Sequence, residues 1–562
     1  MAHTPSFGLQ NVVGNVWPQR LLRIKDMTSY ELHLDGNNAY YRKKDKNPKY
    51  AIISYTWGRF RADGRGKSPI NSKAEAISVN NIKWKIPAID PEQGFTSHNF
   101  KRTLEVVAGS YDYVWVDVAC INQVNDTYNQ IGCQASIFNR ASASFIWLHQ
   151  QGSESGMTLD VLVKALVNTT QSNNIDYNDM SYAQKNASLS RWHELEYRFC
   201  SLLHDPWFSS MWTLQEAFIR KDSVILTGPG NTTRVEFNGK QVTLTLQVLL
   251  DVCHSYLSLG GSNANIARPV ETAGLDLLIA RNPLVLLRAA RHRQAKMSQD
   301  RLAGVQRLFG VDVGKPNATP AEMEKICSLE INKRCPALAQ AFIHPYEGSD
   351  GSPSWQAKLG ISVDPKVHSL GRTARIDDTM IVPPDFTCAV EVAAGYRGRM
   401  FVDRNNNLSW EGSSFPLERL WSMWRQHEQH RIPPGLEEGE FVGPNGSPGG
   451  KNKPFENSFD CSIYLDSLRW LSDRPAINVL PANFMQYAWP LSTVYDLCRK
   501  RPKKVTVLVL GKIQTLIRNK IAEAWVGLLV KQHPQFNVRQ RIGFCTWKGQ
   551  MNNANPDRCG LA

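Results

Sequence analysis

Residues 50–58 of the chain are YAIISYTWG, and this stretch decides the fold class. The run up to Tyr55 is short and mostly apolar, which is typical of a strand buried on both faces of a sheet. Thr56-Trp57-Gly58 closes the run with a turn. Residues 113–121, YVWVDVACI, form a second such run. The sequence therefore predicts two buried strands in this part of the chain.

Helical patterns separate these strands from the next ones. Thr96 or Ser97 is in position to cap a helix, and Asp205-Pro206 gives a later helix an acidic cap with proline at its first position. Further helices are expected at residues 130–141 and 205–220, and further strands at 144–148 and 223–227. Strands that alternate with helices predict a mostly parallel sheet with helices on both faces. We expect this α/β domain to span residues 45–232.

The flanking regions show other patterns. Residues 1–49 are polar and rich in turn-forming residues. Residues 233–345 have mainly helical spacing, and residues 346–562 mix short β-like runs with helical ones, which predicts an α+β region of unknown role. Within that region we expect a strand at 505–510 and a helix at 513–530.

Composition limits the function classes. The 562 residues predict two to four structural units, and 42% hydrophobic residues exclude a mainly disordered chain. The 11 cysteines contain no CxxC pair, which does not indicate a disulfide framework or a zinc site. The sequence has no signal-peptide pattern and no apolar run long enough to span a membrane. We expect a cytoplasmic protein, and the basic run at residues 499–504 also allows a nuclear one.

Glu216 is the first candidate for chemistry. On a helix over residues 205–220 it lies at the rim of a broad aromatic face, one turn beyond Trp212. A carboxylate at such an edge is partly desolvated, which raises its pKa. The alternative is a structural glutamate paired with an arginine or a backbone N–H. Cys120 is a weaker candidate, because a buried and inert cysteine explains it as well.

Three segments together change this balance. Residues 50–58 (YAIISYTWG), 114–123 (VWVDVACINQ) and 212–216 (WTLQE) resemble, in this order, the three conserved blocks of the fungal heterokaryon incompatibility (HET) domain. The resemblance covers about residues 45–310. Two positions depart from the family pattern: Asn122 stands where the family usually carries Asp, and Ser210 stands where a basic residue is usual.

The HET domain is in turn similar to TIR domains, which implies a TIR-like (flavodoxin-like) fold. Trp212 and Glu216 match the W-x-x-x-E spacing of the TIR helix. In TIR enzymes this glutamate carries NAD+ glycohydrolase activity, so the resemblance implies Glu216 as the catalytic carboxylate. NAD is then a substrate, and no bound cofactor and no metal are expected.

Six residues are candidates for contacts with NAD. Trp57 and Trp212 offer faces to an aromatic ring, and Arg59 follows the first strand where it could meet the diphosphate. The remaining candidates are Ser54, Tyr55 and Asp117.

The resemblance implies an effector of fungal non-self recognition and regulated cell death. One hypothesis is an NAD+ glycohydrolase that self-association switches on. The alternative is a non-catalytic signalling module that acts through self-association of the HET domain, and the missing basic residue at Ser210 favours it slightly. In both cases an upstream recognition protein is an expected partner. The net charge of +14 permits nucleic-acid binding, but we do not expect it.

Overall fold

The structure is a computed structural model in which the chain divides into two compact units. One unit covers Phe7–Met323 with Ala374–Thr387, and the other consists chiefly of Glu324–Thr373 and Cys388–Ala562. The structure describes residues 16–56, 75–86, 88–89, 95–122, 133–149, 197, 199–237, 240–258, 264–278, 284–295, 301–302, 304–305, 308, 319–334, 339–340, 342, 355–357, 361, 399–402, 408–422, 462–465, 489–490, 505–517, 520–532, 538–547 and 555–561.

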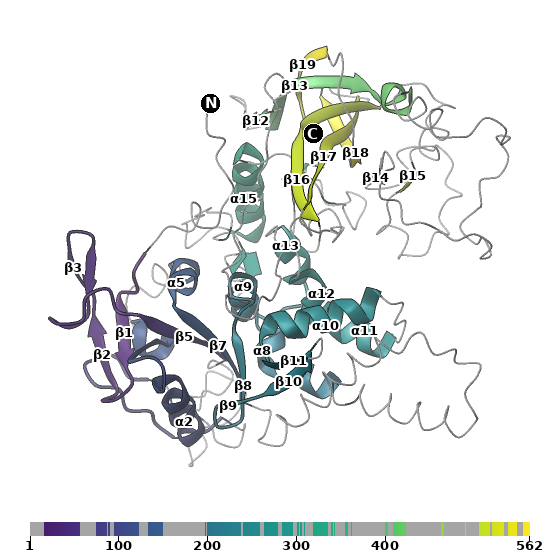
Figure 1. The fold of residues 1–562 in the computed structure, drawn as a ribbon. Helices are drawn as coiled ribbons and strands as arrows, with labels where there is room; N and C mark the ends of the chain where they lie inside the picture. Colours follow the sequence, from purple (N-terminus) through teal and green to yellow (C-terminus); the bar gives the residue numbers. More distant parts are fainter. Residues whose placement is uncertain are drawn as a thin grey trace, which may run out of the picture. The chain divides into compact units, whose positions relative to one another are not determined.

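The first unit is built on a seven-stranded sheet with the order β2-β1-β6-β5-β7-β8-β9 (Figure 1). The four central strands β6, β5, β7 and β8 are parallel, whereas β1, β2 and β9 join antiparallel at the edges. The strands are β1 (Arg20–Arg23), β2 (Thr28–Glu31), β5 (Tyr50–Ser54), β6 (Tyr113–Trp115), β7 (Ala143–Leu148), β8 (Val224–Thr227) and β9 (Asn231–Thr232). This mixed α/β architecture with a parallel core confirms the expected fold class at that level.

Strand β5 is the central strand of the parallel core and has parallel neighbours on both sides. All five of its residues are buried, because β6 and β7 flank it and helices cover its faces. Helix α2 (Ser97–Ala108) connects β5 to β6, and the side chain of Thr96 caps it by accepting a hydrogen bond from the Asn99 N–H, as expected. Helix α5 (Gln134–Arg140) precedes β7.

Two expected elements of this unit are wrong in extent. The run at 113–121 is not one strand, because only β6 is extended and residues Asp117–Cys120 form the short helix α3. The expected helix at 205–220 is interrupted at Ser210, whose φ of −79° and ψ of 140° are extended. The chain therefore forms helix α8 (Pro206–Ser209) and helix α9 (Met211–Ile219).

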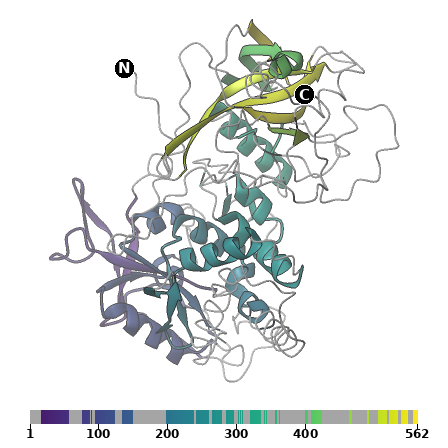
Figure 2. The ribbon, with the colours of Figure 1, turned by 45° about the vertical axis from the view of Figure 1, so that its right-hand side comes forward.

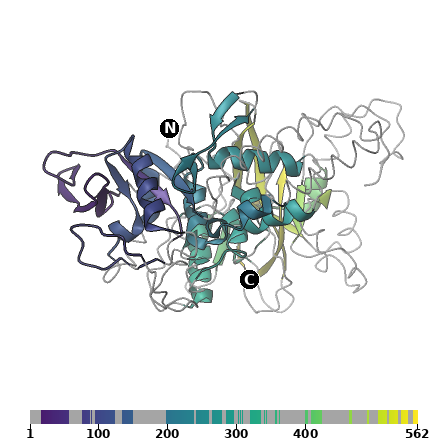
Figure 3. The same cartoon turned by 90° about the horizontal axis from the view of Figure 1, so that it is seen from below.

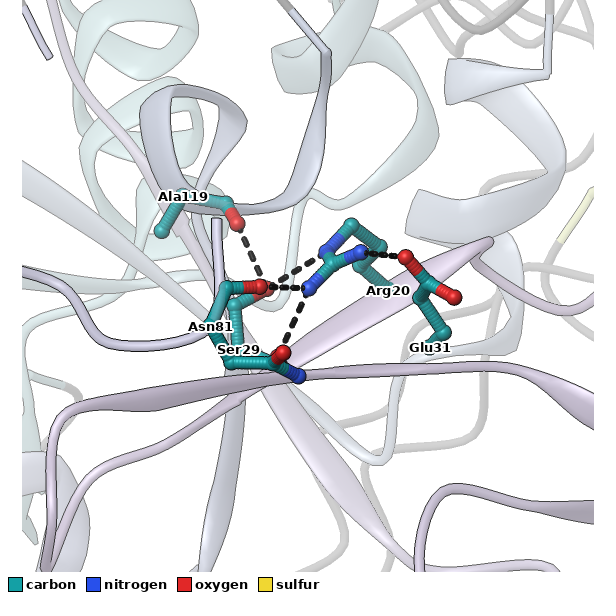
Figure 4. A network of polar contacts seen from close by, with 5 residues as sticks. All are labelled: Arg20, Ser29, Glu31, Asn81 and Ala119. Carbon is teal, nitrogen blue, oxygen red and sulfur yellow. Dashed lines mark hydrogen bonds and ion pairs between the residues drawn. The ribbon is translucent and has the colours of Figure 1, made fainter. Parts of the chain in front are cut away.

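The polar N-terminal residues also contribute to the sheet, which their composition did not predict. Figure 3 shows these purple strands at the outer side of the first unit. Arg20 is buried and donates to the Ser29 hydroxyl at 3.0 Å, to the carbonyl of Asn81 and to the Glu31 carboxylate (Figure 4). The Ser29 hydroxyl in turn donates to the Ala119 carbonyl at 2.7 Å. This network ties the edge hairpin to α3.

Helices complete the first unit on one side of the sheet (Figures 1 and 2). They follow the hairpin of β10 and β11, and a separate small hairpin, β3 and β4, lies before β5. These elements are β3 (His33–Asp35), β4 (Asn38–Tyr40), β10 (Arg234–Phe237), β11 (Lys240–Thr243), α10 (Leu246–Ser258), α11 (Ala264–Ala273), α12 (Leu275–Leu278) and α13 (Val285–Ala289). Helix α15 (Pro320–Arg334) begins in the first unit and has most of its residues in the second.

The second unit contains an eight-stranded antiparallel sheet with the path β12-β13-β16-β17-β18-β14-β15 and with β19 paired to β13. Its strands are β12 (Arg399–Val402), β13 (Leu408–Pro416), β14 (Ser462–Leu465), β15 (Trp489–Pro490), β16 (Thr506–Ile517), β17 (Lys520–Gln532), β18 (Arg539–Trp547) and β19 (Asn555–Gly560). The strand expected at 505–510 is confirmed as part of β16.

The helix expected at 513–530 is wrong, because these residues continue β16 and form most of β17. Residues 525–530 are all buried between neighbouring strands, and a continuous apolar run of this kind fits a buried helix and a buried strand equally well. Gly527 shows how close the strands pack. A Cβ atom there would lie 2.5 Å from a methyl carbon of Val507 and 2.9 Å from the ring of Trp547.

Candidate functional site

The site lies at the point of the sheet where the order in which the strands are added reverses. Strand β5 comes first of the four parallel strands in the chain, β6 is added on one side of it, and β7 and β8 follow on the other side. The carboxyl ends of β5 and β7 therefore flank a topological switch point, where open α/β sheets bind ligands. Ser54 is the last residue of β5 and lies at this point.

Glu216 is bound to this strand end. The Ser54 hydroxyl donates to Oε2 of Glu216, and Nε2 of Gln134 donates to Oε1 at 2.6 Å. The glutamate comes from α9, the glutamine from the first turn of α5, and these helices pack against each other in the region above β5 and β7 in Figure 1. Three elements thus converge on one carboxyl group.

Trp207 completes the cluster from α8. Its indole Nε1–H donates to the Ser54 hydroxyl oxygen at 2.6 Å. The buried side chain of Asp205 caps α8 by accepting from the Trp207 N–H at 2.9 Å, which confirms the expected cap. This cap and the break at Ser210 place Trp207 on a short helix of its own, so that its ring is fully buried.

Hydrogen bonds from Arg293, which follows residues 212–216 in the chain by more than 70 residues, stabilise the break between α8 and α9. Arg293 is fully buried and donates to the carbonyls of Trp207 at 3.0 Å and of Ser210 at 3.3 Å. It also donates to the carbonyl of Ala273. A guanidinium has five N–H donors in a fixed plane, which suits it to join several carbonyl groups at such a junction.

Burial dominates the electrostatics of Glu216. Its side chain lies inside the packed face with 7% of the residue exposed, so the expected position at a rim is wrong. Loss of solvent raises the pKa of Glu216 to about 8, the Ser54 hydrogen bond opposes this change, and the charge of Asp117 adds to it. The expected direction of the pKa change is confirmed. A carboxyl group with a pKa near neutrality is a candidate for acid–base or electrostatic chemistry.

Tyr55 and Asp117 form a second pair beside this cluster. The Tyr55 hydroxyl donates to Oδ1 of Asp117 at 2.5 Å, and the Val118 N–H donates to the same oxygen at 2.8 Å. Burial raises the pKa of Tyr55 well above its usual value, and it also raises that of Asp117 against the effect of these hydrogen bonds. The pair brings together two of the residues that the sequence proposed for NAD contacts.

The other sequence candidates show no hydrogen bond to this cluster or lie outside the described residues. Trp212 is half-buried, and a Cβ atom at Gly304 would lie 3.9 Å from its ring. Trp57 and Arg59 lie outside the described residues. Cys120 is buried and burial raises the pKa of its thiol to about 12, which does not favour the reactive thiolate.

Sequence reasoning did not assign Gln134 and Trp207 to the site, although both contact the central cluster. Gln215, whose burial in the helix face was expected, is 1% exposed, and neither atom of its amide makes a hydrogen bond within the described residues. The Asp205-Pro206 helix start was a local signal for the position of Trp207. No local signal pointed to Gln134, because its partner Glu216 is remote in the sequence.

The first unit is thus an α/β domain with a mostly parallel sheet and a buried carboxyl group at the switch point, the position where open α/β sheets bind ligands. In the comparison with family models, residues 50–216 match the family described as Heterokaryon incompatibility protein (HET). These residues are therefore a HET domain, and the family resemblance of the sequence is confirmed. A HET domain implies a role in heterokaryon incompatibility. No curated protein and no solved structure matches the chain.

Two features are absent from the described residues. None of the helices there combines the length and the apolar character that crossing a membrane requires. Within the same residues, no group of three or more His, Cys, Asp and Glu side chains is arranged to hold a metal ion.

Proposed function

We propose that this protein is a HET-domain effector of fungal non-self recognition and regulated cell death, and that its α/β domain hydrolyses NAD+. The observation that carries the proposal is the carboxyl group of Glu216, which is held at the switch point by Ser54 and Gln134. The order of the four parallel strands, with the first between the second and the third, is that of a flavodoxin-like sheet. This order supports the TIR-like assignment and, through it, the role of Glu216.

The reaction suits a single carboxylate. The bond between the ribose C1′ and the nicotinamide nitrogen breaks, and its electron pair neutralises the cationic ring as nicotinamide leaves. Water then bonds to C1′ and releases a proton, which gives ADP-ribose. No general acid is needed for the leaving group, in contrast to ordinary glycosides, which require two carboxyl groups. What the reaction needs is negative charge beside the sugar as positive charge develops on it.

The ionised Glu216 carboxylate is able to supply this charge. Two unit charges 4 Å apart attract by about 4 kcal/mol at an effective dielectric constant near 20, which corresponds to roughly a thousandfold in rate. A carboxylate has about four lone-pair positions, and Ser54 and Gln134 occupy two of them. In this proposal the remaining positions accept hydrogen bonds from ribose hydroxyl groups.

The test compares NAD+ consumption and nicotinamide release by the purified full chain and by Glu216→Gln. Glutamine keeps the shape of glutamate and removes only the charge, and a rotated Gln134 amide offers it an oxygen in place of N–H donors. We expect turnover by the wild type and a loss of at least about a hundredfold in the variant. Equal turnover in a folded Glu216→Gln variant removes Glu216 from the mechanism.

A second candidate function is a non-catalytic module that acts by self-association and recruits an upstream recognition protein. The burial of Glu216 favours it, since a carboxyl group that joins β5, α5 and α9 stabilises the fold without any substrate. Expression in a fungal host distinguishes the two. Cell death that persists with folded Glu216→Gln supports scaffolding, and cell death that disappears together with NAD+ consumption supports hydrolysis. In both cases we propose action in the cytoplasm.

A further inference from the structure

The hydrogen bonds around Glu216 have a fixed direction. An indole N–H is only a donor, so in the contact between Trp207 and Ser54 the serine oxygen must accept. The single hydroxyl hydrogen of Ser54 is then left for another partner, and Oε2 of Glu216 is the acceptor that it reaches. Trp207 therefore orients Ser54 as a donor toward the carboxyl group.

Gln134 donates to the other carboxyl oxygen of Glu216, Oε1. The distance from its amide Nε2 to Oε1 is 2.6 Å, so the second carboxyl oxygen also accepts a hydrogen bond. The glutamine side chain is buried and lies in the first turn of α5, so it has little freedom to swing away. Each carboxyl oxygen of Glu216 thus accepts a hydrogen bond from a neighbour on a different element.

We propose that Gln134, Ser54 and Trp207 are positioning residues that fix the orientation of the Glu216 carboxylate and favour its ionised form over the protonated one. The inference rests on the proposed function in one respect: the ionised form is the one that NAD+ hydrolysis uses. In the observed arrangement both oxygens of Glu216 face donors, and a protonated carboxyl group finds an acceptor only if the Gln134 amide rotates and gives up its hydrogen bond to Oε1.

The surrounding charges act in the opposite direction or are engaged elsewhere. Burial and the Asp117 carboxyl group on α3 raise the pKa of Glu216, whereas the Ser54 hydrogen bond lowers it. On α5, the Arg140 guanidinium lies 3.5 Å from the ring centre of Trp17, and Arg220, just after α9, pairs with Asp222 at 2.7 Å. His149, after β7, is neutral near pH 7 because burial lowers its pKa to about 4. The Ser54 hydrogen bond therefore opposes burial, and the proposal extends this effect to the Gln134 hydrogen bond.

The experiment measures the pKa of Glu216 without using activity. Hydrogen exchange of the β5 and α9 amides, corrected for the intrinsic effect of pH, is followed from pH 5 to 10 in the full chain with Glu216 and with Glu216→Gln. Each exchange rate gives a free energy of opening, and this free energy is compared between the two chains at every pH. The pH above which the difference between the two chains becomes constant is the pKa of Glu216. The same pair is then measured in the background of Gln134→Met, of Ser54→Ala and of Trp207→Phe. Gln215→Met is the matched control, because it removes a buried amide that makes no hydrogen bond to Glu216.

We expect Gln134→Met and Ser54→Ala each to move this pH upward by about one unit, since each removes a hydrogen bond to the ionised form. Trp207→Phe moves it in the same direction by less, and Gln215→Met leaves it unchanged. The inference is overturned if the Gln134→Met and Ser54→Ala backgrounds keep the wild-type value, or if the control moves it equally.

Activity is a second, separate readout. With NAD+ as the substrate, Gln134→Met should lower kcat about tenfold at pH 7 with little effect on KM, and should recover at higher pH. If no variant and no wild type consumes NAD+ while the pKa still moves, the proposed function fails and the positioning network stands. If NAD+ is consumed while the pKa does not move, the reverse holds.

Discussion

Replacement of Glu216 by glutamine should remove a large part of the pH dependence of the stability of the first unit. Burial raises the pKa of Glu216 to about 8 from the value of 4.5 in an unfolded chain, so between these two pH values the folded state holds a proton that the unfolded state has released. The free energy of unfolding therefore falls as pH rises, by about 1.4 kcal/mol per pH unit. From pH 5 to pH 8 the loss amounts to about 4 kcal/mol.

The assay compares the wild type with Glu216→Gln by hydrogen exchange of the β5 and α9 amides at pH 5, 6, 7 and 8. Other groups that titrate in this range, such as Asp276, whose pKa burial raises to about 7, are common to both chains and cancel in the difference. The free energy of unfolding of the variant should increase relative to that of the wild type with each rise in pH, and the difference should be largest near pH 8. A difference that stays constant over this range would refute the view that Glu216 is desolvated in the folded unit.

Four further predictions concern activity and stability. The kcat/KM for NAD+ should rise about tenfold per pH unit up to pH 8 and then level off, since the ionised Glu216 is the active form; a flat profile would contradict this. Gln215→Met should raise the free energy of unfolding by about 1–2 kcal/mol in urea unfolding, because it removes a buried amide without a hydrogen bond among the described residues, and a less stable variant would speak against it. Arg20→Met should lower the free energy of unfolding by at least about 3 kcal/mol, because it removes several buried hydrogen bonds. Glu31→Gln should lower it by less than about 1 kcal/mol, since the Glu31 side chain is 72% exposed. Similar losses in the two variants would show that the ion pair dominates. A chain limited to residues 45–232 should fail to unfold cooperatively by circular dichroism, since it lacks β1, β2 and Arg293, and cooperative unfolding would show that these parts are dispensable.

The fold was predictable where the local pattern has one physical meaning. The buried run at Tyr50–Ser54, the cap at Thr96 and the acidic start at Asp205 all formed the expected elements. It was not predictable where a pattern has two meanings. Residues 513–530 have the apolar content of a buried helix, and pairing with remote strands makes them β. The division into domains at 45–232, 233–345 and 346–562 stays a prediction.

The site was predictable only in part, for a similar reason. Sequence spacing and resemblance pointed to Glu216, and the structure adds that Ser54 of another element is bound to it. Helix geometry placed Glu216 at a rim, because a wheel drawn through residues 205–220 assumes one continuous helix. The break at Ser210 changes which side chains share a face, and it is Trp207 that contacts Ser54.

The sequence by itself determined the HET family of residues 50–216 and the alternation of strands and helices, and it pointed to Glu216 as the candidate carboxyl group. Only the tertiary structure decided that this group is buried, that Gln134 and Ser54 donate to it, and that its pKa lies near 8. The reason is physical. Strand and helix propensities are local properties of the chain, whereas the desolvation of a carboxyl group and the donors around it depend on which remote segments pack against it.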